Sequence, residues 1–66
     1  MTPRLLGMTL KRFREAKGLS QDALARKARV TREYVNKLEA GRYDPTVGVL
    51  KRLAKALGVP VTELLE

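Results

Sequence analysis

The fold of this chain is decided by residues 20–41, which read SQDALARKARVTREYVNKLEAG. Ser20 and Thr31 are of the residue types that favour the N-cap position of a helix. Each of them is followed by apolar residues at helical spacing. The stretch therefore predicts two short helices, over residues 21–28 and 32–40.

The turn between these two helices spans residues 29–31. Helices joined by so short a turn cross at roughly 90–120°. Ala25 supplies the small side chain that such a close crossing requires. We expect Val30 to fill the inside of the turn, and Val35 and Leu38 to pack the second helix on the first.

Outside this stretch the apolar residues also recur at helical spacing. Three further helices are predicted, over residues 3–17, 47–57 and 61–66, and no stretch has the alternation of a strand. We therefore expect a single all-α domain of five helices that covers residues 1–66. The side chains of these three helices that we expect to face the core are Leu6, Leu10, Phe13, Val49, Leu50, Leu53, Leu57, Leu64 and Leu65.

The charge of the chain points to a polyanionic partner. Lys and Arg number 14 against 7 Asp and Glu, so the net charge is +7. An excess of this size on a small domain favours nucleic acid as the partner, with an anionic membrane surface as the second interpretation. A membrane-binding helix would need exposed aromatic residues, whereas Phe13 is expected to be buried.

The composition also argues against several classes of function. The chain has no His and no Cys, so it lacks the usual zinc ligands, disulfides and the commonest general base. We expect no metal, no cofactor, no small-molecule ligand and no enzymatic activity. The absence of Cys fits a cytoplasmic protein, and the longest apolar run, residues 47–50, is far too short to span a membrane.

The second helix of the 20–41 stretch leaves a narrow polar face that fits a DNA major groove. Arg32 is the candidate for bidentate contact with guanine, and Asn36 for contact with adenine. Lys37 would contact a base or a phosphate. Glu33 has two interpretations, since it would either accept a hydrogen bond from cytosine or pair with Lys37 one turn later.

Residues 10–42, LKRFREAKGLSQDALARKARVTREYVNKLEAGR, resemble the phage-repressor/Cro family, also called the XRE family. The resemblance continues through Asp44-Pro45 and residues 53–59 to residues 63–65. It implies a lambda-repressor-like domain of five helices, with a helix-turn-helix at the second and third, that regulates transcription. It also implies binding to double-stranded DNA as a homodimer.

The resemblance assigns roles to individual residues. Gln21 matches the residue that braces a phosphate, and Arg14 and Glu39 match a buried ion pair. The loop after the second helix of the motif matches a segment that touches the DNA backbone. The expected DNA-binding residues are Gln21, Thr31, Arg32, Glu33, Asn36, Lys37, Arg42 and Tyr43. Tyr34 has two interpretations, contact with DNA or packing at the rim of the domain.

Arg29 departs from the family pattern, which usually has Gly at this point of the turn. The position is expected to need a positive φ, which costs a non-Gly residue roughly 1–2 kcal/mol. An arginine there would add a cation near the DNA backbone.

Several alternatives stay open at this stage. The same fold serves as a protein-interaction adaptor, and within the regulators the chain fits a phage repressor, an antitoxin or a restriction-modification controller. Lys51, Arg52 and Lys55 are expected to form a solvated face. The apolar residues from which a dimer surface would come are Leu57, Val59, Val61, Leu64 and Leu65, part of which must close the core.

Overall fold

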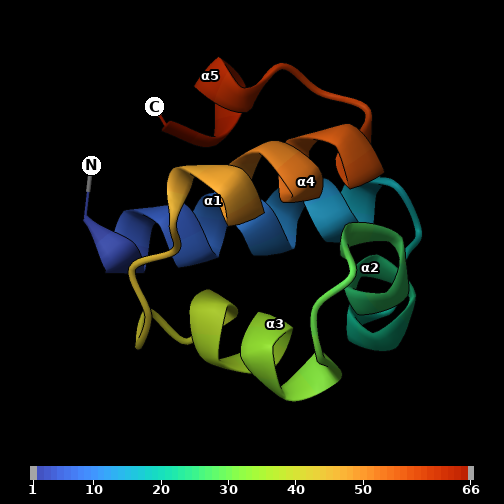
Figure 1. Ribbon diagram of the computed structural model, residues 1–66, viewed down its shortest axis with the longest axis horizontal. Helices are drawn as coiled ribbons and strands as arrows, with labels where there is room; N and C mark the ends of the chain where they lie inside the picture. Colours follow the sequence, from blue (N-terminus) through green and yellow to red (C-terminus); the bar gives the residue numbers. More distant parts are fainter. Residues whose placement is uncertain (1, 66) are drawn as a thin grey trace.

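The computed structural model describes residues 2–65, and within them the chain forms five helices and no strand (Figure 1). The helices are α1 (Pro3–Ala16), α2 (Gln21–Ala28), α3 (Arg32–Glu39), α4 (Val47–Leu57) and α5 (Val61–Leu65). The expected all-α fold with a helix-turn-helix at α2 and α3 is therefore confirmed.

Side-chain hydroxyls define where the first four helices begin. The oxygens of Thr2, Ser20, Thr31 and Thr46 accept hydrogen bonds from the backbone N–H three residues later, at 3.1, 3.0, 3.0 and 3.2 Å. Each bond satisfies a donor that has no partner within the helix.

Two helices end one residue earlier than predicted. Lys17 and Ala40 are C-caps rather than helical residues, because the chain reverses at the glycines that follow them, Gly18 (φ 70°) and Gly41 (φ 76°). The predicted end of the last helix, residue 66, lies outside the described residues.

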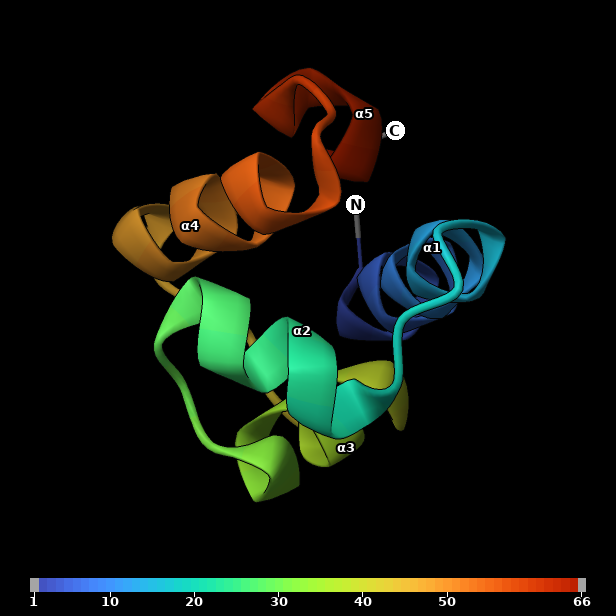
Figure 2. The ribbon, with the colours of Figure 1, turned by 90° about the vertical axis from the view of Figure 1, so that its right-hand side faces the viewer.

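The helices pack as a ring around one core. α2 packs against both α3 and α4, α1 packs against α3, and α5 contacts both α4 and α1. Figure 2 shows this ring with α5 between α4 and α1 at the top and α3 at the bottom. The eight largest fully buried side chains are Leu6, Leu10, Leu24, Val35, Leu38, Leu53, Leu57 and Leu64.

Three residues that were expected in the core lie at its edge, and one of them, Val49, is half-buried and packs against the core from outside. Leu65 is 42% exposed, because successive helical residues point about 100° apart and Leu64 already faces inward. Phe13 is half-buried and packs against the outside of the core, with the Arg12 guanidinium 5.9 Å from its ring centroid.

Small residues set the distance between helices. Ala25 is buried where α2 meets α3. Gly7 allows a close approach between α1 and α3. A methyl group at this position would overlap the carbonyl oxygen of Leu38 and come within 2.8 Å of the carbonyl oxygen of Glu39. The C-terminal end of α3 is therefore held close to α1.

Arg29 has the backbone conformation that was predicted for it. It is the C-cap of α2 with φ 58° and ψ 45°, in the left-handed region that costs an L-residue roughly 1–2 kcal/mol. Val30 follows, half-buried against the core, so the turn that leads into α3 is packed from inside.

No helix within residues 2–65 is both long and apolar enough to cross a membrane.

Candidate nucleic-acid interface

α3 presents one face to the core and the opposite face to solvent. Val35 and Leu38 are fully buried, whereas Arg32, Glu33 and Asn36 are exposed. In Figure 1, α3 forms the lower edge of the molecule, on the side opposite α5. The structure thus leaves a polar helix face free on a rigid support.

Four of the expected site residues lie together in a depression between α2 and α3. Its volume is about 290 Å³, and it is lined by Gln21, Arg32, Glu33 and Asn36. Residues from the first turn of α2 and from α3 meet here because the two helices cross closely at Ala25. The side chains offer donors and acceptors, as a base edge requires.

A chain of hydrogen bonds connects this depression to the interior. Arg14 Nε donates to Glu39 Oε2 at 2.6 Å, and Arg14 Nη2 donates to Glu39 Oε1 at 3.1 Å. Gln21 Nε2 donates to Glu39 Oε1 at 3.0 Å, and Asn36 Nδ2 donates to Gln21 Oε1 at 3.3 Å. We call these four residues the polar ladder.

The inner end of the polar ladder is the buried ion pair that was expected. The side chains of Arg14 and Glu39 are only 10% and 4% exposed, so this prediction is confirmed. Arg14 also donates to the carbonyl oxygen of Leu19 at 2.7 Å. The hydrogen bond to Glu39 raises the pKa of the Arg14 guanidinium above its ordinary value, so this side chain stays charged at any pH at which the protein is folded.

The outer end of the polar ladder consists of two residues that the sequence analysis assigned to DNA contact. The sequence assigned Gln21 to a phosphate and Asn36 to a base. In the structure their amides are bonded to each other, and Gln21 also to Glu39. These bonds fix the orientation of two side chains at the surface of the depression.

A second group of expected residues lies where the chain leaves α3. The Lys37 ammonium is 5.6 Å from the ring centroid of Tyr43, and the rings of Tyr34 and Tyr43 have centroids 5.3 Å apart. The backbone N–H of Arg42 donates to the carbonyl oxygen of Lys37 at 3.0 Å. The loop is therefore folded against the end of α3.

Two further residues have defined surroundings. The Thr31 hydroxyl caps α3 by accepting from the Tyr34 N–H at 3.0 Å, while the residue as a whole stays exposed. Glu33 forms no ion pair with Lys37 within residues 2–65, where all ion pairs involve Arg14 or Arg26.

The prediction that Arg52 lies on a solvated face is wrong. Its Nε donates to the carbonyl oxygen of Ala28 at 2.9 Å, which satisfies an acceptor at the C-terminal end of α2. The two residues are 24 positions apart, so no local pattern in the sequence could indicate the contact.

Comparison with known proteins agrees with this geometry. The helix-turn-helix family matches residues 10–64 of the chain. An uncharacterised helix-turn-helix transcriptional regulator of Sinorhizobium fredii, y4dJ, is 40% identical over 94% of this chain and 80% of its own length. The immunity repressor of Bacillus phage phi105 is 35% identical over 91% of this chain, which spans 42% of that repressor.

Solved structures show the same arrangement of helices. The restriction-modification controller C.AhdI from Aeromonas hydrophila superimposes with a TM-score of 0.92 at 35% identity, over 94% of both chains. The clp gene regulator ClgR from Corynebacterium glutamicum gives a TM-score of 0.94 at 34% identity, over 98% of this chain and 69% of its own.

The family match covers most of the chain, the relatives are regulators, and the fold and the expected ion pair are both present. This chain belongs to the helix-turn-helix family of DNA-binding transcriptional regulators.

Proposed function

We propose that this chain is a cytoplasmic regulator that binds double-stranded DNA sequence-specifically, with α3 in the major groove and residues 1–66 acting as one binding unit. The exposed polar face of α3, held by the polar ladder, carries this proposal. α3 has eight residues and is therefore about 12 Å long. The major groove is about 12 Å wide and admits a helix of this kind.

The proposed contacts divide into two kinds. Arg32, Glu33 and Asn36 would face base edges, and Arg32 would make bidentate contact with guanine. Gln21, Thr31, Lys37, Arg42 and Tyr43 lie around them and contact the phosphate backbone. Phosphate contacts position the protein, whereas base contacts select the sequence. The role is one of binding and needs neither a metal nor a cofactor.

We further propose that two copies bind together on a two-fold DNA site. Part of the apolar set that was considered for the dimer surface closes the core, since Leu57 and Leu64 are 1% exposed. Leu65 remains exposed on α5, and Val59 and Val61 are half-buried beside it. The surface around α5 is therefore the proposed contact between the copies.

The test begins with selection of bound duplexes from a random DNA pool. Arg32→Ala is then compared with Gln21→Ala on the selected duplex and on a scrambled one. We expect Arg32→Ala to cost about 1–3 kcal/mol on the selected duplex and to relax the preference at one base pair. Gln21→Ala should weaken binding to both duplexes alike. Lys11→Ala, which removes one exposed charge from α1, is the control.

Equal losses on both duplexes for Arg32→Ala would make it a phosphate contact. If no duplex is bound even at low salt, the DNA-binding proposal fails, and a protein-interaction adaptor becomes the better interpretation.

A further inference from the structure

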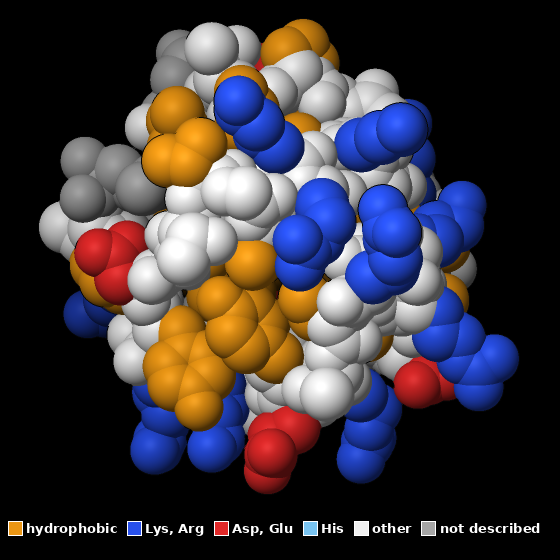
Figure 3. Space-filling model, viewed as in Figure 1, with side chains coloured by type: hydrophobic (Ala, Val, Ile, Leu, Met, Phe, Trp, Pro, Cys, Tyr) orange, Lys and Arg blue, Asp and Glu red, His pale blue; other side chains and the backbone are white. Residues whose placement is uncertain are grey.

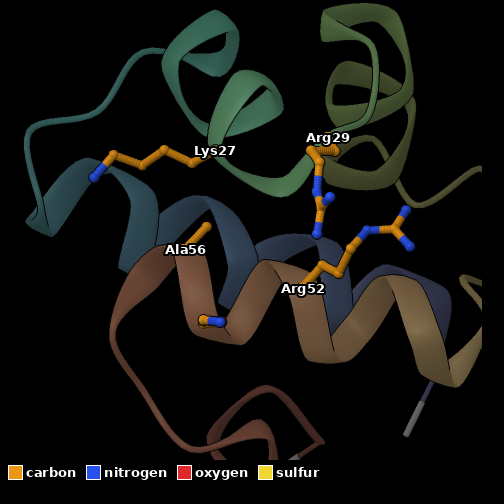
Figure 4. Close-up of a pocket in the computed structure, with 5 residues that line it drawn as sticks. Lys27, Arg29, Arg52 and Ala56 are labelled. Carbon is orange, nitrogen blue, oxygen red and sulfur yellow. The ribbon is translucent and has the colours of Figure 1, made fainter.

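A second basic site lies outside the depression at α3. A cavity of about 280 Å³ opens between α2 and α4 (Figure 4). Its lining is cationic apart from one alanine, and consists of Lys27, Arg29, Arg52, Lys55 and Ala56. We call it the α2–α4 cavity. None of its four cations forms an ion pair with any residue from 2 to 65.

The cations are spread along the α2–α4 cavity. Arg52 is fixed by its hydrogen bond to Ala28, and Figure 4 shows Arg29 descending toward it from the turn before α3. Lys27 points in a different direction, away from the two arginines. Figure 3 shows Lys and Arg side chains gathered over this face, with acidic side chains toward its margins. An extended row of anions fits this spread better than one small ion does.

The backbone at Arg29 is a second, independent observation. Among residues 2–65 it is the one non-glycine residue with a positive φ, while Gly18, Gly41 and Gly58 occupy the other such positions. Glycine takes this conformation without strain. A strained residue of this kind is a reason to look for a function of its side chain, and here the side chain lines the α2–α4 cavity.

The position of the α2–α4 cavity relative to α3 suggests what binds there. Arg29 lies three positions before Arg32, which lines the depression at α3. With eight residues, α3 is about 12 Å long, whereas the phosphates of one strand follow one another every 3.4 Å or so along the axis of the duplex. A duplex read by α3 thus extends past its N-terminal end, where the turn carries Arg29.

We infer that the α2–α4 cavity binds backbone phosphates of the DNA that flanks the base pairs read by α3. The inference rests on the proposed function. The Arg29 guanidinium would make charge-assisted hydrogen bonds to phosphate oxygens, and Lys27, Arg52 and Lys55 would add attraction without sequence preference.

Arg29→Gly tests this inference with little risk to folding, because glycine keeps the left-handed conformation and removes only the side chain. Binding is measured on two duplexes with the same selected site. One extends about ten base pairs beyond the N-terminal end of α3, a full helical turn, and the other ends at the edge of the site. We expect Arg29→Gly to weaken binding roughly threefold to tenfold on the long duplex and to equal the wild type on the short one. The slope of log affinity against log salt on the long duplex should fall by about 0.9 for each phosphate that the variant no longer neutralises.

Lys11→Gln is the matched control, since it removes one exposed charge from α1, and its effect should not depend on the flank. Lys27→Gln and Lys55→Gln should show the same flank dependence as Arg29→Gly, to a smaller extent. Arg32→Ala should weaken binding to both duplexes.

Three outcomes overturn the inference. The first is an Arg29→Gly effect that is absent or equal on the two duplexes. The second is saturable binding of inorganic phosphate that is lost in Arg29→Gly, while DNA binding by this variant shows no flank dependence. The third is the same result with poly-glutamate in place of inorganic phosphate. In all three cases weaker binding by Arg32→Ala leaves the proposed function standing. If the wild type binds neither duplex, the proposed function fails as well.

Discussion

Arg14 and Glu39 form a full ion pair in the interior of a very small domain. Removing two charges from water is costly, and the cost is offset only when the geometry is good and the remaining donors are satisfied. Here the Arg14 guanidinium donates two hydrogen bonds to Glu39 and one to the carbonyl oxygen of Leu19. Gln21 donates a further hydrogen bond to the Glu39 carboxylate. No buried side-chain donor or acceptor within the described residues lacks a partner.

Glu39→Gln should destabilise the protein strongly, because it leaves the buried Arg14 guanidinium without its counter-charge. A loss of about 3–5 kcal/mol in the free energy of unfolding is expected, measured by urea unfolding followed by circular dichroism. Arg14→Met should cost a similar amount, and the double variant should cost clearly less than the sum of the two.

The matched control is the exposed pair of Asp22 and Arg26, whose side chains are 51% and 81% exposed. Asp22→Asn should cost less than about 1 kcal/mol. Small additive losses at Arg14 and Glu39 would contradict the view that their pairing matters to the fold.

Single side chains also show where sequence reasoning reaches its limit. The positive φ of Arg29 could be predicted from the family resemblance, because the family usually has Gly at this position of the turn. The contact of Arg52 with Ala28 could not be predicted, since it depends on how α4 packs across α2. The mutual bonding of Gln21 and Asn36 likewise depends on the crossing of α2 and α3.

The contact of α1 with α3 is closer than two ordinary helices allow. Gly7 is buried in the middle of α1, where glycine is normally unfavourable by about 1 kcal/mol relative to alanine. Its lack of a side chain lets the carbonyl groups of Leu38 and Glu39 approach the α1 backbone. The last turn of α3, which carries Glu39, is thereby placed within reach of Arg14.

Two glycine-to-alanine substitutions should therefore have opposite effects. Gly7→Ala forces α1 and α3 apart and should destabilise by about 1–3 kcal/mol, despite the better helix propensity of alanine. Gly48→Ala lies at the exposed start of α4, where the nearest atom to a new methyl group is 3.9 Å away, and should be neutral or stabilise by up to about 1 kcal/mol.

Thermal unfolding of the two variants side by side is the measurement. A stabilised Gly7→Ala would show that the approach of α1 to α3 is not as tight as the structure indicates.

The dimensions of the molecule suit paired binding. The principal extents of the Cα trace are 25 × 23 × 21 Å, so two copies in contact can place their α3 helices about 34 Å apart, one turn of the duplex. One short helix reads too few base pairs to select a site in a genome. We therefore expect footprints of two inverted half-sites about 10 base pairs apart, centre to centre.

Leu65→Ser should reduce the cooperativity of this binding without unfolding the protein, because Leu65 is exposed on α5. The measurement is occupancy of the two half-sites as a function of protein concentration. Glu63→Gln, on the same helix but nearly opposite Leu65, is the control. A single asymmetric footprint with one protein per duplex would contradict the paired arrangement.

The architecture as a whole could be predicted from the sequence, because helix caps, glycines and apolar spacing act locally and all indicate the same helices. All five helices begin where these signals place them. The exposure of Leu65 and the half-burial of Phe13 could not be predicted from the sequence, because they depend on which side chains fill the core at the centre of the ring of helices.

Some side chains at the exposed surface of α2 and α3 are hydrogen-bonded within the polar ladder, and others make no such bond. Gln21 and Asn36 are bonded within the protein, whereas the Arg32 and Glu33 side chains make no hydrogen bond to residues 2–65. Substitutions at these two exposed positions therefore leave the fold intact. In evolutionary terms, and if α3 reads DNA as proposed, we expect that such a regulator can acquire new target sites through changes at Arg32 and Glu33, whereas changes at Arg14, Gln21 and Glu39 would disrupt the polar ladder.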